Sequence, residues 1–115
     1  MPQVNRLTRG EASVGALQIG SAGETVYGID FGTVAIDPAS IAATTRGATT
    51  FTLTGAATTD IIIVNPPSTL NDDLIFAGAA VTAADTVSIY LYNPTASGID
   101  QASATFSYCW IDTTA

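Results

Sequence analysis

The sequence has no histidine and no lysine, a single cysteine, and few charged residues of either sign. Without histidine, the usual Ser-His-Asp and Cys-His nucleophile arrangements and histidine-based zinc sites are excluded. Without lysine, a phosphate-binding P-loop and Schiff-base chemistry are excluded too, and one cysteine cannot build a thiolate cluster. Most of the familiar catalytic and metal-binding arrangements are therefore excluded for this chain.

Pairs of carboxylates are the catalytic arrangement that remains, because the chain contains ten Asp and Glu residues and two carboxylates can suffice for hydrolysis. Most of the aspartates, however, stand at predicted turns and strand ends, where Asp accepts hydrogen bonds from its own turn: Asp60, Asp72, Asp73, Asp85, Asp100 and Asp112. We therefore expect no catalytic residue, no cofactor and no enzymatic activity.

The densest group of side-chain oxygens is Asn71, Asp72 and Asp73. Together with Asp85 or Asn65, these residues could hold a calcium ion, although their spacing is not that of an EF-hand loop. A solvated acidic turn explains the same residues and is the preferred interpretation. We therefore expect no metal site.

The charge that is present is mostly negative: ten acidic residues oppose three arginines, which gives a formal net charge of -7. Nucleic-acid binding requires clustered basic side chains, so DNA and RNA are not expected partners. Arg6 and Arg9 form a small basic start to the chain. Two interpretations stay open: these arginines meet an acidic partner, or they merely solvate a loose terminus.

Long apolar runs are also missing. No segment reaches the roughly 18 to 20 apolar residues of a transmembrane helix, and the first residues lack the apolar core of a secretory signal. The single cysteine, Cys109, cannot form an internal disulfide, which agrees with synthesis in the cytoplasm. We expect no membrane segment, and we expect Cys109 to be a small buried hydrophobic residue.

What the chain does contain favours β-structure. Threonine is frequent, the helix-favouring residues Lys and Glu are absent or scarce, and these preferences favour strands over helices. From residue 31 onward, short strand patterns alternate with turn residues, as in a sandwich or small barrel. We predict an all-β domain over residues 31–115, a small antiparallel β-sandwich or barrel of immunoglobulin-like or related type.

Residues 1–30 differ from this pattern, because glycines recur at short intervals with little sustained periodicity. We interpret them as an extended N-terminal arm that contacts partner subunits. The short apolar patches 14–19 and 26–29 could still form strands.

The individual strands are marked by their alternation and by the residues that end them. GTVAIDP ends at Pro38, and TTFTLTG places Phe51 and Leu53 on one face with threonines on the other. DIIIVNPP is continuously apolar from Ile61 to Val64, which predicts a central strand covered on both faces. Two further strands with a turn near residues 83–85 follow, and ATFSYCWI is the last strand.

Aromatic side chains occupy a whole register in two of these strands. In DTVSIYLYNPT, Tyr90 and Tyr92 alternate with Val, Ile and Leu, and in ATFSYCWI, Tyr108 and Trp110 follow Phe106 on one face. Neither strand therefore has a plainly polar face. Three interpretations remain open: one register fills the core while the other lies under a loop or the arm, the aromatics form an oligomer interface, or they form a platform for sugars.

Two stretches resemble a recurrent small β-domain of tailed-bacteriophage virions: TVAIDPASIAATTRGATTFTLTGAATTDIIIVNPP and LIFAGAAVTAADTVSIYLYNPTASGIDQASATFSYCWI. The features that carry the resemblance are IDPASIAA before a Thr-rich strand, the VNPP strand end, AGAAVTAADTV, and the LYNPTA turn before IDQASATFSY. They cover about residues 33–111 and are turns and strand ends. They imply a fold and a setting, and no catalytic or binding residue.

The resemblance implies a head decoration (cement) protein that sits on the major capsid protein at the outer surface of the virion and stabilises the capsid. Such a protein is made in the host cytoplasm and needs no catalysis. The implied state is a homo-oligomer, with a trimer favoured and a dimer as the alternative. An alternative function is a host-recognition or glycan-binding module of a phage fibre or tail.

These expectations select two sets of residues. The candidates for capsid contact lie in the arm: Arg6, Arg9, Val14, Leu17 and Ile19. The candidates for the oligomer interface are the aromatic residues of the two strands: Tyr90, Tyr92, Tyr108 and Trp110.

Overall fold

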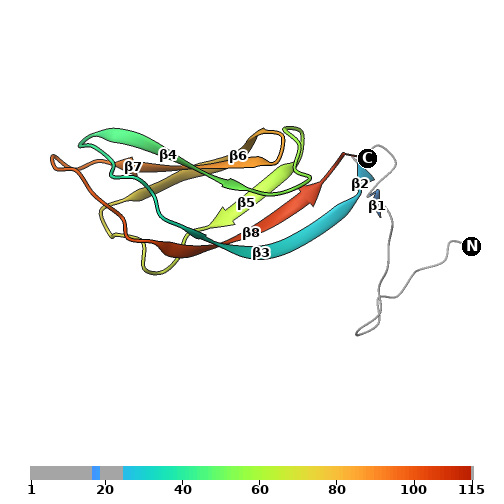
Figure 1. Ribbon diagram of the computed structural model, residues 1–115, viewed down its shortest axis with the longest axis horizontal. Coiled ribbons are helices and arrows are strands. Elements are labelled where there is room, and N and C mark those ends of the chain that lie inside the picture. Colours follow the sequence, from blue (N-terminus) through green and yellow to red (C-terminus); the bar gives the residue numbers. More distant parts are fainter. Residues whose placement is uncertain (1–16, 19–24, 115) are drawn as a thin grey trace, which may run out of the picture.

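The computed structural model describes residues 17–18 and 25–114, and these residues form strands, turns and loops without any helix (Figure 1). The strands are β1 (Leu17–Gln18), β2 (Thr25–Val26), β3 (Gly28–Ile36), β4 (Thr45–Thr52), β5 (Ile61–Asn65), β6 (Ile75–Ala83), β7 (Thr86–Asn93) and β8 (Ala104–Asp112). The prediction of an all-β protein is confirmed.

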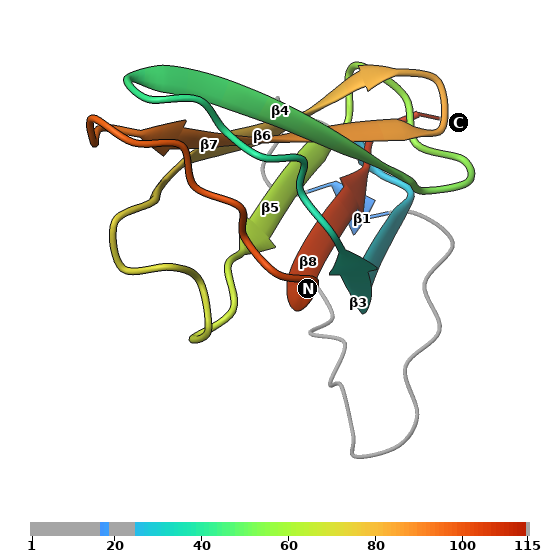
Figure 2. The ribbon, with the colours of Figure 1, turned by 60° about the vertical axis from the view of Figure 1, so that its left-hand side comes forward.

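The strands from β3 to β8 form two antiparallel three-stranded sheets, with the orders β3-β8-β5 and β4-β7-β6. Figure 2 shows them as two layers. The buried side chains between the layers come from every strand of both sheets: Ile36, Phe51, Val64, Val81, Val87, Ile89 and Phe106. This core cluster lies between the two sheets, and a second, smaller buried cluster consists of Ile41, Leu74 and Leu91.

Several sequence predictions are confirmed inside this core. Phe51 and Leu53 are buried, while the alternating threonines Thr50, Thr52 and Thr54 are exposed. The hairpin of β6 and β7 turns at Ala84 and Asp85, where predicted. Asp85 has a positive φ of 60°, a conformation that Asp tolerates better than most residues.

The position of β5 was predicted wrongly. Its continuous apolar run predicted a central strand covered on both faces, but β5 is an edge strand of its sheet. Val64 faces the core, whereas the side chains of Ile61 and Ile63 are 51% and 58% exposed. The apolar run of β5 therefore directs some side chains into the core and leaves the others exposed on the outer side of the sheet.

The chain enters the domain slightly earlier than predicted. Strand β3 begins at Gly28 rather than at residue 31, and the Tyr27 N–H donates to the Asp112 carbonyl at 2.7 Å, which extends the contact between β3 and β8. Within the predicted arm, β1 pairs antiparallel with β2, with Leu17 opposite Val26. Both patches that could form strands thus contribute residues to strands.

The turn after β7 is organised by one fully buried side chain, Asn93. Its amide nitrogen donates to the carbonyls of Ile41, Ala42 and Ser97 at 3.0, 3.3 and 2.8 Å. Its oxygen accepts from the N–H and the hydroxyl of Thr95 at 2.9 and 2.7 Å. The asparagine of the LYNPTA motif therefore connects the loop after β3 to the loop after β7.

Candidate interaction surface

The outward side of the β3-β8-β5 sheet carries the largest apolar side chains that the described structure exposes. Successive residues of a strand point to opposite faces, and the strand register aligns the odd-numbered residues in three rows across the sheet. The rows are Ile29, Ile111 and Ile61, then Phe31, Cys109 and Ile63, then Thr33, Ser107 and Asn65. We call these nine residues the outer apolar face.

Its large residues are well exposed. Phe31 is 76% exposed and Ile29 is 52% exposed on β3, and the two isoleucines of β5 are exposed to a similar degree. None of the nine residues carries a charge, although the chain as a whole has a net charge of -7. Monomeric soluble proteins rarely expose a contiguous apolar area of this kind unless it serves an interaction.

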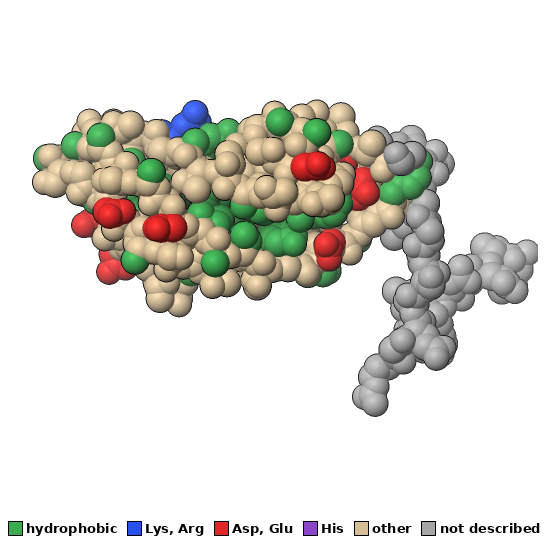
Figure 3. Space-filling model, viewed as in Figure 1, with side chains coloured by type: hydrophobic (Ala, Val, Ile, Leu, Met, Phe, Trp, Pro, Cys, Tyr) green, Lys and Arg blue, Asp and Glu red, His purple; other side chains and the backbone are tan. Residues whose placement is uncertain are grey.

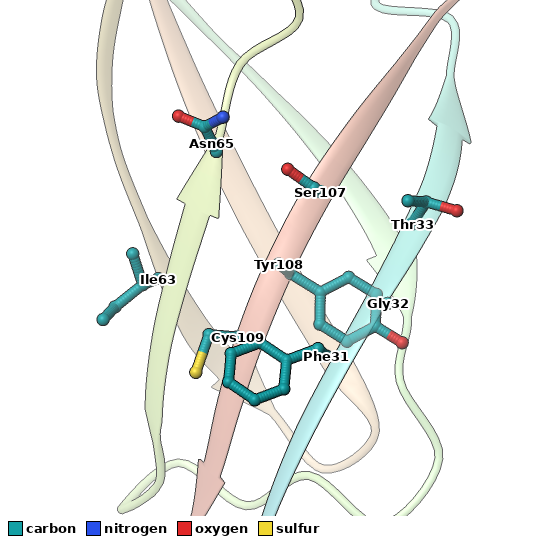
Figure 4. A pocket seen from close by; sticks show the side chains of 8 residues that line it. All are labelled: Phe31, Gly32, Thr33, Ile63, Asn65, Ser107, Tyr108 and Cys109. Atoms are coloured by element: carbon teal, nitrogen blue, oxygen red, sulfur yellow. The ribbon is translucent and has the colours of Figure 1, made fainter.

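The outer apolar face is hollowed along its central strand. Ser107 and Cys109 of β8 are small, whereas Phe31 on β3 and Ile63 on β5 are large, so a groove of about 460 Å³ lies between them. Figure 4 shows these side chains around the groove, with Asn65 and Thr33 at one end. The shape suits an apolar side chain from outside better than a polar small molecule, because the lining offers few polar groups.

The placement of Cys109 differs from the prediction of a buried hydrophobic residue. Cys109 lies on the outer apolar face, half-buried between Phe31 and Ile63. The strand pattern could not reveal this, because Cys109 and Trp110 are adjacent and either register could have faced the core.

The predicted oligomer-interface aromatics are divided between two faces. Tyr108 and Trp110 point between the sheets, where both pack against the core. The Tyr108 ring lies 5.8 Å from that of Phe51, and a side chain at Gly32 would meet the Tyr108 hydroxyl at 2.5 Å. These two aromatics therefore belong to the interior, although each keeps some exposed surface.

Tyr90 and Tyr92 lie on the outward side of the other sheet and are half-buried. The Arg46 guanidinium covers the Tyr90 ring, with 4.4 Å between its carbon and the ring centroid, a favourable cation–π geometry. Arg46 pairs with Tyr92 across β4 and β7. Figure 3 shows a basic side chain at the surface of the domain, together with a band of hydrophobic side chains between the two layers.

A second buried polar residue, Asp60, anchors the end of β8. Its carboxylate accepts hydrogen bonds from the Trp110 ring N–H at 3.0 Å, the Ala57 N–H at 2.9 Å and the Thr113 N–H at 3.0 Å. Burial raises the pKa of Asp60, but the hydrogen bonds from Ala57, Thr113, Trp110 and Thr114 outweigh burial and lower the pKa to about 2. Asp60 therefore acts as a structural anion.

Among the other aspartates considered for chemistry, Asp85 and Asp112 accept hydrogen bonds within the fold, and the Asp112 carboxylate accepts from the Thr114 N–H at 2.9 Å. The Asn71 side chain accepts from the Asp73 N–H at 2.9 Å, and the Asp85 carboxylate accepts from the Gly55 N–H at 2.8 Å. Within residues 17–18 and 25–114, no three His, Cys, Asp or Glu side chains gather as metal ligands. The described part also has no helix long and apolar enough to span a membrane.

Most of the predicted capsid-contact residues lie outside the described residues: Arg6, Arg9, Val14 and Ile19. Leu17 is described as part of β1.

The outer apolar face is a surface that the sequence prediction missed. Its signals were the apolar run of β5 and the odd register of β8, which had no plainly polar character.

Comparisons of this chain with protein-family models, with curated proteins and with solved structures give no match.

Proposed function

We propose that this protein is a non-enzymatic structural component of a tailed-bacteriophage virion, a decoration (cement) protein that binds the major capsid protein on the outer head surface and stabilises the capsid. The observation that carries the proposal is the outer apolar face. A rigid sheet that presents large apolar side chains without charge suits permanent contact with protein, and such contact is what a cement protein requires.

The chemistry of the described residues agrees with this class. The outer apolar face lacks the acid, base or charged group that would polarise a substrate. The Asp60 carboxylate, whose pKa is lowered to about 2, is occupied by hydrogen bonds within the fold. The resemblance in sequence to small phage β-domains supplies the setting.

Two parts of the chain have separate roles in this proposal. The arm, with Arg6 and Arg9, contacts the capsid protein, while the domain associates with further copies of itself. Arginines suit contact with carboxylates of a partner, because the guanidinium forms bidentate hydrogen bonds. Adding contact area between neighbouring capsid subunits is how such a protein would oppose their separation.

The glycan-binding alternative is less favoured by the geometry. Stacking on a sugar requires a free aromatic face, but the Tyr90 ring is covered by Arg46 and the Trp110 ring packs against the core. Saturable binding of the pure protein to a host glycan would favour this alternative.

Cosedimentation of the full chain with empty phage heads tests the proposal. We expect the wild-type protein to sediment with the heads and the double variant Arg6→Glu, Arg9→Glu to remain in solution. Arg46→Glu is the matched control, because it reverses a basic charge on the domain rather than in the arm, and it should still bind.

A wild-type protein that ignores heads from every candidate phage would contradict the proposed function. Undiminished binding by the double variant would instead contradict only the role of the arm.

A further inference from the structure

We propose that the outer apolar face is covered by the same face of a second copy of this chain, related by a two-fold axis, with Phe31 of each copy in the groove of the other. This pairing places a second copy of the chain at the surface on which the proposed function rests. The pairing itself is supported by the charge and shape of that surface.

The absence of charge on the outer apolar face permits contact with a second copy. Each copy carries a net charge of -7, so two copies repel except where they meet through uncharged surface. The nine residues of the outer apolar face provide such a surface. Two of these faces can pack without removing any charged group from water, which is the costly step in burying polar surface.

Shape supports the same partner. Phe31 projects from β3 beside the groove that Ser107 and Cys109 leave on β8. A projecting side chain and a groove on one face are self-complementary under a two-fold rotation, because each copy supplies what the other receives. A sheet also packs well on a sheet, at about 10 Å between layers.

Symmetry distinguishes a pair from the trimer that the resemblance implies. A three-fold ring needs two different complementary surfaces on each copy, whereas a two-fold contact uses one surface twice. The outer apolar face covers one side of one sheet and meets the two-fold requirement alone. The outward side of the other sheet carries Arg46 over Tyr90 instead.

The available area sets the expected strength of the contact. Three strands about 4.8 Å apart and three rows about 6.8 Å apart give a plan area of roughly 300 Å² on each copy, or roughly 600 Å² over both, which is the size of a weak, transient interface. We therefore expect a weak pair that forms reversibly, so that dilution separates the copies.

Light scattering of the purified full-length protein over a range of concentration measures this equilibrium. We expect the mass to rise from one copy to two, and Phe31→Asp to weaken the pairing by roughly 30-fold or more, as for a central aromatic anchor. Phe31 is 76% exposed, so this variant should fold normally, which circular dichroism checks. Ile63→Asp gives an independent second variant on β5.

Ile75→Asp is the matched control. Ile75 is 52% exposed on the outward side of the β4-β7-β6 sheet, close to the exposure of Ile61 and Ile63. The control changes the same residue type to the same charge on the opposite side of the molecule. It should pair as tightly as the wild type.

Alkylation of Cys109 by iodoacetamide reports on the same face, because Cys109 is the only cysteine and lies at its centre. Pairing should slow the reaction at high concentration, and dilution or Phe31→Asp should restore its rate. Protection that does not depend on concentration, in a protein that stays monomeric, would show that the chain's own arm covers the face and would overturn the proposal.

Three other results would overturn it as well: a monomer with freely reactive Cys109 at all concentrations, an oligomer that survives Phe31→Asp, or equal weakening by Ile75→Asp. None of these measurements involves phage heads. A failure of self-association is therefore distinguishable from a failure of capsid binding.

Discussion

Two buried polar side chains, Asp60 and Asn93, connect segments of this domain that a disulfide would connect in many small β-domains. Asp60 ties the turn before β5 to the end of β8, and Asn93 ties the loop after β3 to the loop after β7. The chain has one cysteine and cannot make such a link covalently. Hydrogen bonds to the buried side chains of Asp60 and Asn93 take the place of a disulfide, and losing them leaves buried donors or acceptors unsatisfied.

Replacing Asp60 by asparagine tests the first of these connections. Asp60→Asn keeps the shape but removes the charge, and its amide cannot accept from the Trp110 ring and both backbone N–H groups at once. We expect a loss of about 2 kcal/mol in the free energy of unfolding, measured by urea denaturation. Asp72→Asn, at an exposed turn, should change stability little.

The pH dependence of stability follows from the same residue. The pKa of Asp60 is about 2 in the folded protein and about 3.9 in an unfolded chain, so the unfolded chain binds more protons between these values. The stabilisation is complete above about pH 4 and is lost as the pH falls to about 2. Urea denaturation between pH 5 and pH 2 should therefore show a steeper loss for the wild type than for Asp60→Asn; parallel curves would contradict this assignment.

Asn93→Ala tests the second connection. The substitution removes all five hydrogen bonds of a fully buried side chain and leaves the Ala42 carbonyl and the Thr95 N–H without the partner that Asn93 provides. We expect a loss of about 3 kcal/mol in the free energy of unfolding. Asn65→Ala, an exposed asparagine at the end of β5, is the matched control, and a similar loss there would refute the special role of Asn93.

At the scale of strands, the alternation of apolar and polar residues predicted which side of a strand faces the core, but it did not predict which strands pair. The inward side of β4 and the β6–β7 hairpin were predictable from Phe51, Leu53 and the turn near Asp85, because side-chain period and turn chemistry are local. The edge position of β5 was not, since β5 pairs with β8 far along the chain. The outer apolar face depends on that non-local pairing, so each of its strands could be recognised but their assembly into one surface could not.

The close contact between β3 and β8 offers a test at this scale. A β-carbon on Gly32 would lie 2.5 Å from the Tyr108 hydroxyl, so Gly32→Ala must displace the ring from its place beside Phe51. We expect a loss of about 1 to 3 kcal/mol in thermal or urea unfolding. Gly28→Ala in the same strand meets only the Asp112 β-carbon at 3.9 Å, and it should be neutral or slightly stabilising.

At the scale of the whole molecule, the uneven distribution of charge predicts how salt acts on self-association. Two copies of charge -7 repel at long range, while the proposed contact itself contains no charge. Added salt screens repulsion over distances beyond about 10 Å at 0.1 M. Raising sodium chloride from low concentration to 0.15 M should therefore tighten the pair, as measured by sedimentation; weakening would indicate that ion pairs hold the copies together.

The order of strands in the β3-β8-β5 sheet has a consequence for the timing of folding. β8 lies between β3 and β5 and pairs with both, so neither strand belongs to this sheet until β8 has been synthesised. Pairing strands this distant along the chain is slow compared with closing the β6–β7 hairpin. A growing chain on the ribosome therefore lacks the completed outer apolar face, and neighbouring nascent chains cannot associate through it.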